Sequence, residues 1–446
     1  MNNTDLFKKY NVAAPRYTSY PTVPYWDNEC FNTQKWLTAL KSTYQRYKEE
    51  GISLYIHLPF CESLCTYCGC NTRITKNHGV ELPYLEAVIK EWEMYCAVLG
   101  ERPKIKELHL GGGTPTFFSP ENLKTLILGI VKDGAEGIAC SFEGHPDNTT
   151  IYHLQTLYSL GFKRLSLGIQ DFDPKVQLMI NRFQTPEQVF RIISEARAIG
   201  YESINFDLIY GLPGQTLKGL TQTINEVIDM QPERIAFYGY AHVPWLKPGQ
   251  RHYSETDIPQ GNEKFALYQV GRELLIETGY QEIGMDHFAL KKDSLYQASE
   301  NTLLHRNFMG YTDRSTKILI GLGVSSISDS HTAFAQNSKT VENYLNNINN
   351  SVFSIEKGHI LNEIDSYIKH HILNLMCKGR THFDQLIPET IQERLAPLLK
   401  DNLIEVNDQE VRITRLGKSF LRNVCMAFDE RLWASKPETT LFSKAI

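Results

Sequence analysis

The stretch Tyr55-Ile56-His57-Leu58-Pro59-Phe60-Cys61-Glu62-Ser63-Leu64-Cys65-Thr66-Tyr67-Cys68 decides how the rest of the sequence is interpreted. Its apolar first half predicts a buried strand over Leu54–Leu58, and a cysteine-rich loop follows directly. Cys61, Cys65 and Cys68 supply three thiolates, one fewer than a closed zinc site or a fully ligated four-iron cluster requires. If they hold three corners of a four-iron cluster, the fourth iron stays open to a non-protein ligand.

A zinc knuckle is the alternative interpretation of this loop, with Cys70 or His57 as the fourth ligand. Only one glycine separates Cys70 from Cys68, which makes Cys70 an awkward ligand for the same metal, so we assign it to a cofactor pocket. The clustering of four of the nine cysteines favours metal binding over a disulfide framework. The five scattered cysteines are expected to be small buried hydrophobic residues.

Short β-rich runs alternate with amphipathic helical segments from about Ile52 to Ile283. This alternation predicts an α/β fold of parallel strands joined by crossovers, either a full or partial barrel or an open doubly wound sheet. The predicted strands are Leu54–Leu58, Ile105–Leu110, Gly137–Phe142, Arg164–Ile169, Ser203–Ile209 and Arg234–Tyr238, with Gln281–Ile283 as a further candidate. Ser119-Pro120-Glu121 predicts a helix start, and Gly161 a helix end.

Functional residues of such folds gather at the carboxyl ends of the strands. Polar, glycine-rich and metal-binding residues follow the predicted strands: the cysteine cluster, Gly111-Gly112-Gly113-Thr114, Glu143, Gln170, Gly211-Leu212-Pro213 and Tyr240-Ala241-His242. The sequence therefore predicts a single site at one end of the sheet.

Composition and charge exclude several classes of function. A net charge of −5 gives no general attraction to nucleic acid or to an anionic membrane, so a small-molecule substrate is expected. No secretory signal and no run of roughly 18 apolar residues is present, which predicts a cytoplasmic protein. Three domains are expected, over residues 1–50, 51–355 and 356–446. The last is mainly helical with a hairpin around Asn407-Asp408; this resembles a winged helix, but a helical cover is the simpler role.

The spacing Cys61-x3-Cys65-x2-Cys68, with aromatic Tyr67 before the third cysteine, is identified as the signature of the radical S-adenosylmethionine (SAM) superfamily. The glycine run after the second strand resembles the motif that binds the SAM amino group there. More narrowly, the chain resembles the oxygen-independent coproporphyrinogen III oxidases almost from end to end. The motifs that carry this resemblance are residues 15–21, 55–61, 68–70, 111–116, 166–172, 205–213, 284–289, 305–308 and 422–426.

The resemblance implies a partial (βα)6 barrel, an N-terminal extension covering the site and a mainly helical C-terminal domain. It implies oxidative decarboxylation of two propionate side chains of coproporphyrinogen III to vinyl groups, giving protoporphyrinogen IX in heme biosynthesis. The reagent is a 5′-deoxyadenosyl radical made from SAM at a 4Fe–4S cluster, with two SAM molecules in the pocket. A monomer that uses an unidentified electron donor and acceptor is expected. The rivals are a sister radical SAM protein of heme trafficking or anaerobic heme degradation, and a non-catalytic heme- or metal-binding module.

Matching motif by motif, the resemblance implies that Cys61, Cys65 and Cys68 are the cluster ligands and catalytic residues. The implied SAM contacts are Tyr55, Tyr67, Cys70, Gly112, Gly113, Thr114, Glu143, Gln170, Arg182, Asp207, Ala241 and Ile327. Glu143 and Asp207 are suited to ribose hydroxyls or the sulfonium, and Arg182 to a SAM carboxylate. Ala241 and Ile327 would contact adenine.

A tetra-anionic substrate also needs cations. Arg16, Arg306 and the aromatic N-terminal stretch are our hypothesis for the propionates and the rings. One position departs from the family pattern: His145 stands before Pro146, where the family more often has an acidic residue or asparagine. We expect His145 to be a loop residue rather than a ligand.

Overall fold

A computed structural model describes residues 3–132, 135, 137–435 and 442–444. Its centre is a curved twelve-stranded sheet with the strand order β16-β15-β14-β13-β1-β4-β5-β6-β7-β8-β10-β9. Neighbouring strands from β13 to β8 in this order run parallel. These strands are β13 (Leu319–Leu322), β1 (Ile52–Leu58), β4 (Ile105–Gly112), β5 (Ala139–Gly144), β6 (Phe162–Gln170), β7 (Ser203–Tyr210) and β8 (Arg234–Gly239). All six strands predicted in this run are present.

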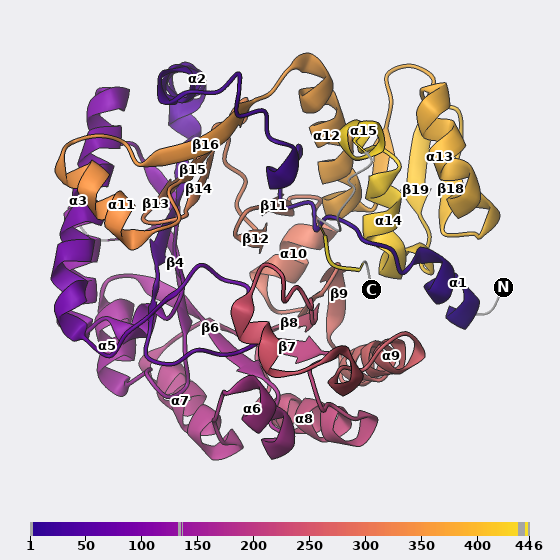
Figure 1. Cartoon of the computed structure of the whole chain (residues 1–446), viewed down its shortest axis with the longest axis horizontal. Helices are drawn as coiled ribbons and strands as arrows, with labels where there is room; N and C mark the ends of the chain where they lie inside the picture. Colours follow the sequence, from indigo (N-terminus) through magenta and orange to yellow (C-terminus); the bar gives the residue numbers. More distant parts are fainter. Residues whose placement is uncertain (1–2, 133–134, 136, 436–441, 445–446) are drawn as a thin grey trace.

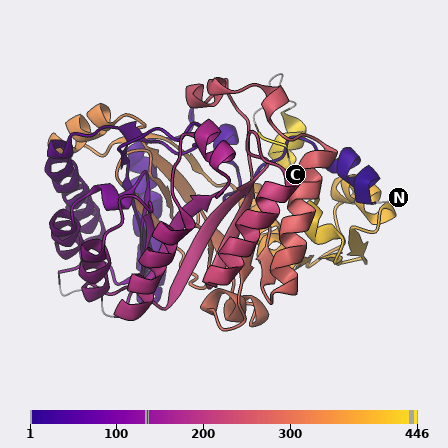
Figure 2. The same cartoon turned by 90° about the horizontal axis from the view of Figure 1, so that it is seen from below.

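Helices cover the outer face of the parallel strands, as Figure 1 shows along its left and lower rim, and Figure 2 shows from below. They are α3 (Glu81–Leu99), α4 (Pro120–Ile130), α5 (Ile151–Ser159), α6 (Pro174–Ile180), α7 (Pro186–Ile199), α8 (Leu217–Met230) and α9 (Asn262–Glu277). Ser119 caps α4, accepting a hydrogen bond from the Asn122 amide at 3.2 Å, as predicted. Parallel strands with helices on one face make this a partial barrel.

Antiparallel strands extend the sheet at both edges. β14 (Ile327–Asp329), β15 (Ala333–Asn337) and β16 (Ile355–Ile360) follow β13, and β10 (His287–Ala289) and β9 (Gln281–Gly284) follow β8. The candidate strand Gln281–Ile283 is therefore present, but β10 separates it from β8. The sheet runs on to Ile360, past the boundary expected at residue 355; α10 (Ser294–Glu300) and α11 (Val341–Asn349) lie in the connections.

A separate hairpin, β11 (His305–Asn307) and β12 (Gly310–Thr312), lies beside the interior of the barrel. The Thr312 hydroxyl donates to Glu107 of β4 at 2.7 Å, and Arg164 of β6 contacts Asp313 at 3.3 Å. These contacts tie the hairpin to strands that are distant from it in sequence.

The C-terminal part is mainly helical, and it contains the predicted hairpin. Its elements are α12 (Glu363–Lys378), β17 (Arg380–His382), α13 (Glu389–Lys400), β18 (Ile404–Val406), β19 (Glu410–Ile413), α14 (Leu421–Met426) and α15 (Glu430–Ala434). β18 and β19 flank Asn407-Asp408, and β17 joins them as a third strand. Among the described helices, none is both long and apolar enough to span a bilayer.

The N-terminal residues pack against this C-terminal part, and α1 (Asn3–Tyr10) lies beside it in Figure 1. After α1, Ala13 forms a β-bridge with Lys444, and Arg422 donates to the carbonyls of Ala14 and Pro15. The Tyr17 hydroxyl donates to Asp429 at 3.0 Å. The chain then returns to the barrel through α2 (Thr33–Tyr47). These contacts fix the stretch that carries Arg16.

Candidate active site

The cysteine loop follows β1 and is held from two sides. β2 (Phe60–Cys61) pairs with β3 (Arg73–Ile74), which closes the loop at its base. The Thr66 amide donates to the carbonyl of Ile180 at the end of α6 at 3.0 Å, and Asn181 donates to the carbonyl of Leu64 at 2.8 Å. The cysteines are therefore carried on a fixed loop at the carboxyl end of β1.

The glycine run packs directly against this loop. The Gly113 amide donates to the Leu58 carbonyl at 2.8 Å, and a Cβ at Gly113 would lie 2.6 Å from the Pro59 carbonyl carbon. Gly112 has φ +113°, and a Cβ there would lie 2.6 Å from the His57 ring. Thr114 then reaches the Cys61 sulfur, 3.3 Å from its hydroxyl. Only glycine allows these two segments to approach so closely.

A cavity of about 250 Å³ opens beside the loop, and twelve of the fifteen predicted site residues line it. They are Cys61, Cys65, Tyr67, Cys68, Cys70, Gly112, Gly113, Thr114, Glu143, Gln170, Arg182 and Asp207. We call this space the cysteine cavity. Strands β4 to β7 contribute Gly112, Glu143, Gln170 and Asp207 toward their carboxyl ends, the edge at which the sequence predicted the site.

The other three predicted residues do not line the cysteine cavity. Tyr55 lies within β1, before the cysteine loop, and its hydroxyl is 3.0 Å from Nδ1 of His57. The Ala241 carbonyl accepts a hydrogen bond from Gln250, whose amide also donates to the Tyr67 carbonyl. Ile327 begins β14, two strands from β1. Their contacts with SAM stay predictions.

Two carboxylates face the cysteine cavity from β5 and β7. Glu143 accepts from the Gly112 amide at 3.2 Å and from His109 Nε2 at 3.3 Å. Burial acts to raise its pKa, but these hydrogen bonds outweigh burial and leave the pKa lowered. Asp207 accepts from Ser166 at 3.2 Å and Asn205 at 2.8 Å, and burial, with the charge of Glu143, raises its pKa to about 6.

The guanidinium of Arg182 lies next to the cysteine loop. Its NH1 atom lies 3.6 Å from the Cys65 sulfur, and NH2 donates to the Gly168 carbonyl. β6 is irregular here, between Gly168 and Gln170, and Gln170 has φ +67°. A non-glycine residue in this conformation is strained, and such strain gathers at functional sites. The irregularity brings Gln170 and Arg182 to the same cavity.

The loop suits a cluster with one open corner better than a zinc knuckle. Both His57 ring nitrogens are occupied, by the Tyr55 hydroxyl and by the Asn71 carbonyl at 2.9 Å, so this histidine is not free to be a fourth ligand. Within the described residues, no three Cys, His, Asp or Glu side chains are grouped so as to hold one metal ion. Cys61, Cys65 and Cys68 all line the cysteine cavity, and three thiolates leave one corner of a four-iron cluster without a protein ligand. A hydrogen bond from Cys70 lowers the pKa of the Cys68 thiol.

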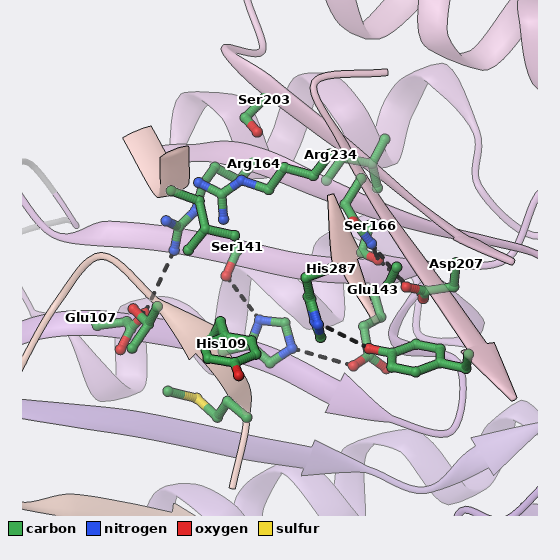
Figure 3. Close-up of a pocket in the computed structure, with 18 residues that line it drawn as sticks. Glu107, His109, Ser141, Glu143, Arg164, Ser166, Ser203, Asp207, Arg234 and His287 are labelled. Carbon is green, nitrogen blue, oxygen red and sulfur yellow. Dashed lines mark hydrogen bonds and ion pairs between the residues drawn. The ribbon is translucent and has the colours of Figure 1, made fainter. Parts of the chain in front are cut away.

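Sequence reasoning missed His109 and Tyr238. A second cavity, of about 160 Å³, lies inside the barrel and shares Glu143, Asp207 and Tyr238 with the cysteine cavity (Figure 3). In this view His109 points between Ser141 and Glu143. The sequence did hold a signal for His109. Residues two apart on a strand share a face, so the alternation of side chains along β4 could have placed His109 on the same face as Gly111. His145, expected to be a loop residue, follows β5 and lines the cysteine cavity.

The two candidate substrate arginines lie together near the end of β8. Arg16 donates to Asp286 at 3.3 Å and to the Gly239 carbonyl at 3.2 Å, and its guanidinium lies 5.4 Å from the centre of the Tyr238 ring. Arg306 donates to the Arg16 carbonyl at 3.3 Å. Both are therefore linked to the cysteine cavity through Tyr238.

Comparisons with known proteins agree with this geometry. Residues 55–227 match the model of the radical SAM superfamily. The chain is 38% identical to the oxygen-independent coproporphyrinogen III oxidase of Pseudomonas aeruginosa over 96% of each chain, and 36% identical to that of Escherichia coli over 99% and 98%. The solved coproporphyrinogen III oxidase of Escherichia coli, described as a radical SAM enzyme, superposes with a TM-score of 0.87 at 35% identity, covering 93% of this chain and 97% of that one. The chain belongs to the family of oxygen-independent coproporphyrinogen III oxidases.

Proposed function

We propose that the cysteine cavity is the active site at which this radical SAM enzyme converts coproporphyrinogen III to protoporphyrinogen IX in heme biosynthesis. One observation carries the proposal. The three cysteines of the signature share a single cavity with the glycine run, two carboxylates and Arg182, as a site for a cluster and SAM requires.

Members of this family use a 4Fe–4S cluster and SAM. We propose that Cys61, Cys65 and Cys68 hold the cluster and leave one iron for SAM, and that the pocket takes two SAM molecules. When bound, these groups supply the 5′-deoxyadenosyl radical that removes hydrogen from a propionate side chain.

The side chains around the cavity then bind and orient SAM. Glu143 and Asp207 would accept hydrogen bonds from ribose hydroxyls or face the sulfonium. Arg182 would pair with a carboxylate. The remaining proposed contacts are Tyr55, Tyr67, Cys70, Gly112, Gly113, Thr114, Gln170, Ala241 and Ile327.

Each propionate that reacts loses one hydrogen atom, carbon dioxide and one electron, so an electron acceptor must complete the reaction. An electron donor must also reduce the cluster. We propose that Arg16, Arg306 and the aromatic-rich stretch 15–21 contact the substrate, and that the enzyme works as a cytoplasmic monomer without nucleic acid or membrane partners.

An anaerobic assay with reductant, SAM and coproporphyrinogen III tests the function. Wild-type protein should form protoporphyrinogen IX together with 5′-deoxyadenosine. Cys65→Ser should form neither, whereas Cys30→Ser, which changes an exposed cysteine outside the loop, should match the wild type. Formation of 5′-deoxyadenosine without protoporphyrinogen IX would reject the substrate and keep the radical SAM chemistry.

A further inference from the structure

A third cavity, of about 180 Å³, lies between the N-terminal residues 17–20, the loop 315–317, β14 and α12. The β11–β12 hairpin contributes lining residues both to this cavity and to the cavity inside the barrel. Met309, Tyr311 and Thr312 of the hairpin line the inner cavity, whereas His305 and Arg306 line this one. We call it the outer pocket.

Cations outnumber carboxylates around the outer pocket. Its charged lining residues are Arg306, Lys317, Lys369 and Asp329. Lys369 contacts Asp329 at 3.1 Å, so this pair is neutral overall. Arg306 and Lys317 form no ion pair with any described residue. Two positive charges therefore remain uncompensated at one cavity.

Arg306 is the residue most in need of an acceptor. It is 8% exposed, and its Nε and NH1 atoms are buried without a hydrogen-bond partner among the described residues. Its NH2 atom donates to the Arg16 carbonyl, and its guanidinium lies 4.5 Å from the centre of the Tyr311 ring. Buried charged donors are normally satisfied, so an unsatisfied pair of them indicates an anion that the chain itself does not supply.

The histidines of the outer pocket add no charge near neutral pH. Burial, assisted by Lys369 and Lys317 and opposed by Asp329, lowers the pKa of His305 to about 4. Burial and the same two lysines also lower the pKa of His331. All four side chains line the outer pocket, and its excess positive charge belongs to Arg306 and Lys317.

The outer pocket is connected to the proposed active site by direct contacts. Arg306 holds the Arg16 carbonyl, and Arg16 lies over Tyr238, which lines the cysteine cavity. Behind them, the Tyr311 ring packs on His287 at 5.2 Å, and His287 packs on Tyr238 at 5.7 Å. A continuous row of contacting side chains therefore joins the lining of the outer pocket to the lining of the cysteine cavity.

We propose that the outer pocket binds the carboxylate of a propionate side chain that the reaction leaves intact, with Arg306 and Lys317 as its partners. The inference rests on the proposed function. Coproporphyrinogen III carries four propionates and two of them react, so two carboxylates have to be held while another is presented to the cysteine cavity. A planar guanidinium can bind a carboxylate through two parallel hydrogen bonds, and a nearby ammonium adds charge.

Lys317→Gln is the sharpest test, because it removes one charge from a half-buried side chain and leaves the Lys369–Asp329 pair in place. With cluster-loaded enzyme, KM for coproporphyrinogen III should rise about 10-fold with kcat nearly unchanged, because the contact is the same in the ground and transition states. KM for SAM should not change. Arg306→Lys should raise KM less than Arg306→Gln. Lys124→Gln, on the outer face of α4, is the matched control and should have no effect.

Equilibrium binding of coproporphyrin III, followed by its fluorescence, separates this inference from the proposed function. Weaker binding by Lys317→Gln would support the pocket even if the wild type failed to make protoporphyrinogen IX. Unchanged binding and KM in both Lys317→Gln and Arg306→Gln would overturn it. Titration with inorganic phosphate tests the alternative that the outer pocket binds a free inorganic anion and not a carboxylate of the substrate. Phosphate binding that Lys317→Gln abolishes, with substrate affinity unchanged, would identify a free-anion site and also overturn the proposal.

Discussion

The carboxyl groups of Glu91, which is buried, and Asp207, which is half-buried, have similarly raised pKa values but opposite surroundings. Glu91 of α3 accepts hydrogen bonds from the Gly323 amide at 2.8 Å, Asn337 at 2.7 Å and Tyr344 at 2.7 Å. Its partners therefore come from three other segments of the chain. Burial raises the pKa of Glu91 to about 7 and that of Asp207 to about 6.

The difference lies in what else each carboxyl group can contact. Protein donors surround Glu91 completely, and it is 0% exposed, so it can only hold α3 against the sheet. Asp207 has neighbours on one side and a cavity on the other. A raised pKa therefore does not identify a functional residue by itself; the open side does.

The largest effect should come from the cluster ligands. Cys65→Ala should lower product formation by on the order of 1000-fold or more, because a cluster with an open corner depends on each of its three ligands. Iron content and 5′-deoxyadenosine formation measure this loss. The melting temperature of the metal-free protein should hardly move, since Cys65 lies in a loop and is only half-buried. A large drop in the melting temperature would show that Cys65 stabilises the fold of the metal-free protein.

Glu91→Ala should show the reverse behaviour. It leaves two buried donors, the Gly323 amide and the Tyr344 hydroxyl, without an acceptor, which should cost about 3 kcal/mol of unfolding free energy. Urea unfolding measures the loss. KM for SAM in the folded fraction should stay at the wild-type value. A changed KM would show that Glu91, like Asp207, affects SAM binding.

Asp207→Asn should raise KM for SAM about 10-fold by removing a charged acceptor from the cysteine cavity. Asparagine has nearly the same shape, so the unfolding free energy should change by less than about 1 kcal/mol. Steady-state kinetics with varied SAM measures the change in KM, and urea unfolding measures the change in unfolding free energy. An unchanged KM would remove Asp207 from the SAM site.

The last effect is a change of stability with pH. The folded-state pKa of Glu91, about 7, lies above the ordinary value of 4.5, so the folded state binds its proton more tightly than the unfolded state. Stability from this group is present below pH 4.5 and is lost as pH rises toward 7. Glu91→Gln does not titrate, so the loss of unfolding free energy between pH 4.5 and 7 should be smaller by roughly 2 to 3 kcal/mol. If the unfolding free energy of Glu91→Gln has the same dependence on pH between 4.5 and 7 as that of the wild type, another group causes the pH dependence.

Local pattern was enough to predict the six strands from β1 to β8, because each has apolar residues at successive or alternate positions and is followed by glycine or polar residues. It did not reveal β13, which completes the parallel run. Leu319–Leu322 is short and leads into Gly323, and its strand character comes from pairing with β1, far away in sequence.

The site residues also fall into two groups, those that the sequence predicts and those that only the folded structure reveals. The cysteine loop, the glycine run and Glu143 follow predicted strands, so their meeting could be inferred. His109 and Tyr238 lie within strands, where only the register of the folded sheet decides which side chains face the cavity. Lys317 and Lys369 come from a loop and a helix outside the parallel strands, and no spacing in the sequence connects them.

The bridge between Ala13 and Lys444 has a consequence for biosynthesis. Chains emerge from the ribosome with the N-terminus first, and domains generally fold as they appear. The stretch before Arg16 finds Arg422 and Lys444 only after all the strands of the barrel have been translated. The barrel can thus assemble, with its cysteines accessible to iron delivery, before Arg422 and Lys444 hold the stretch that carries Arg16 in place.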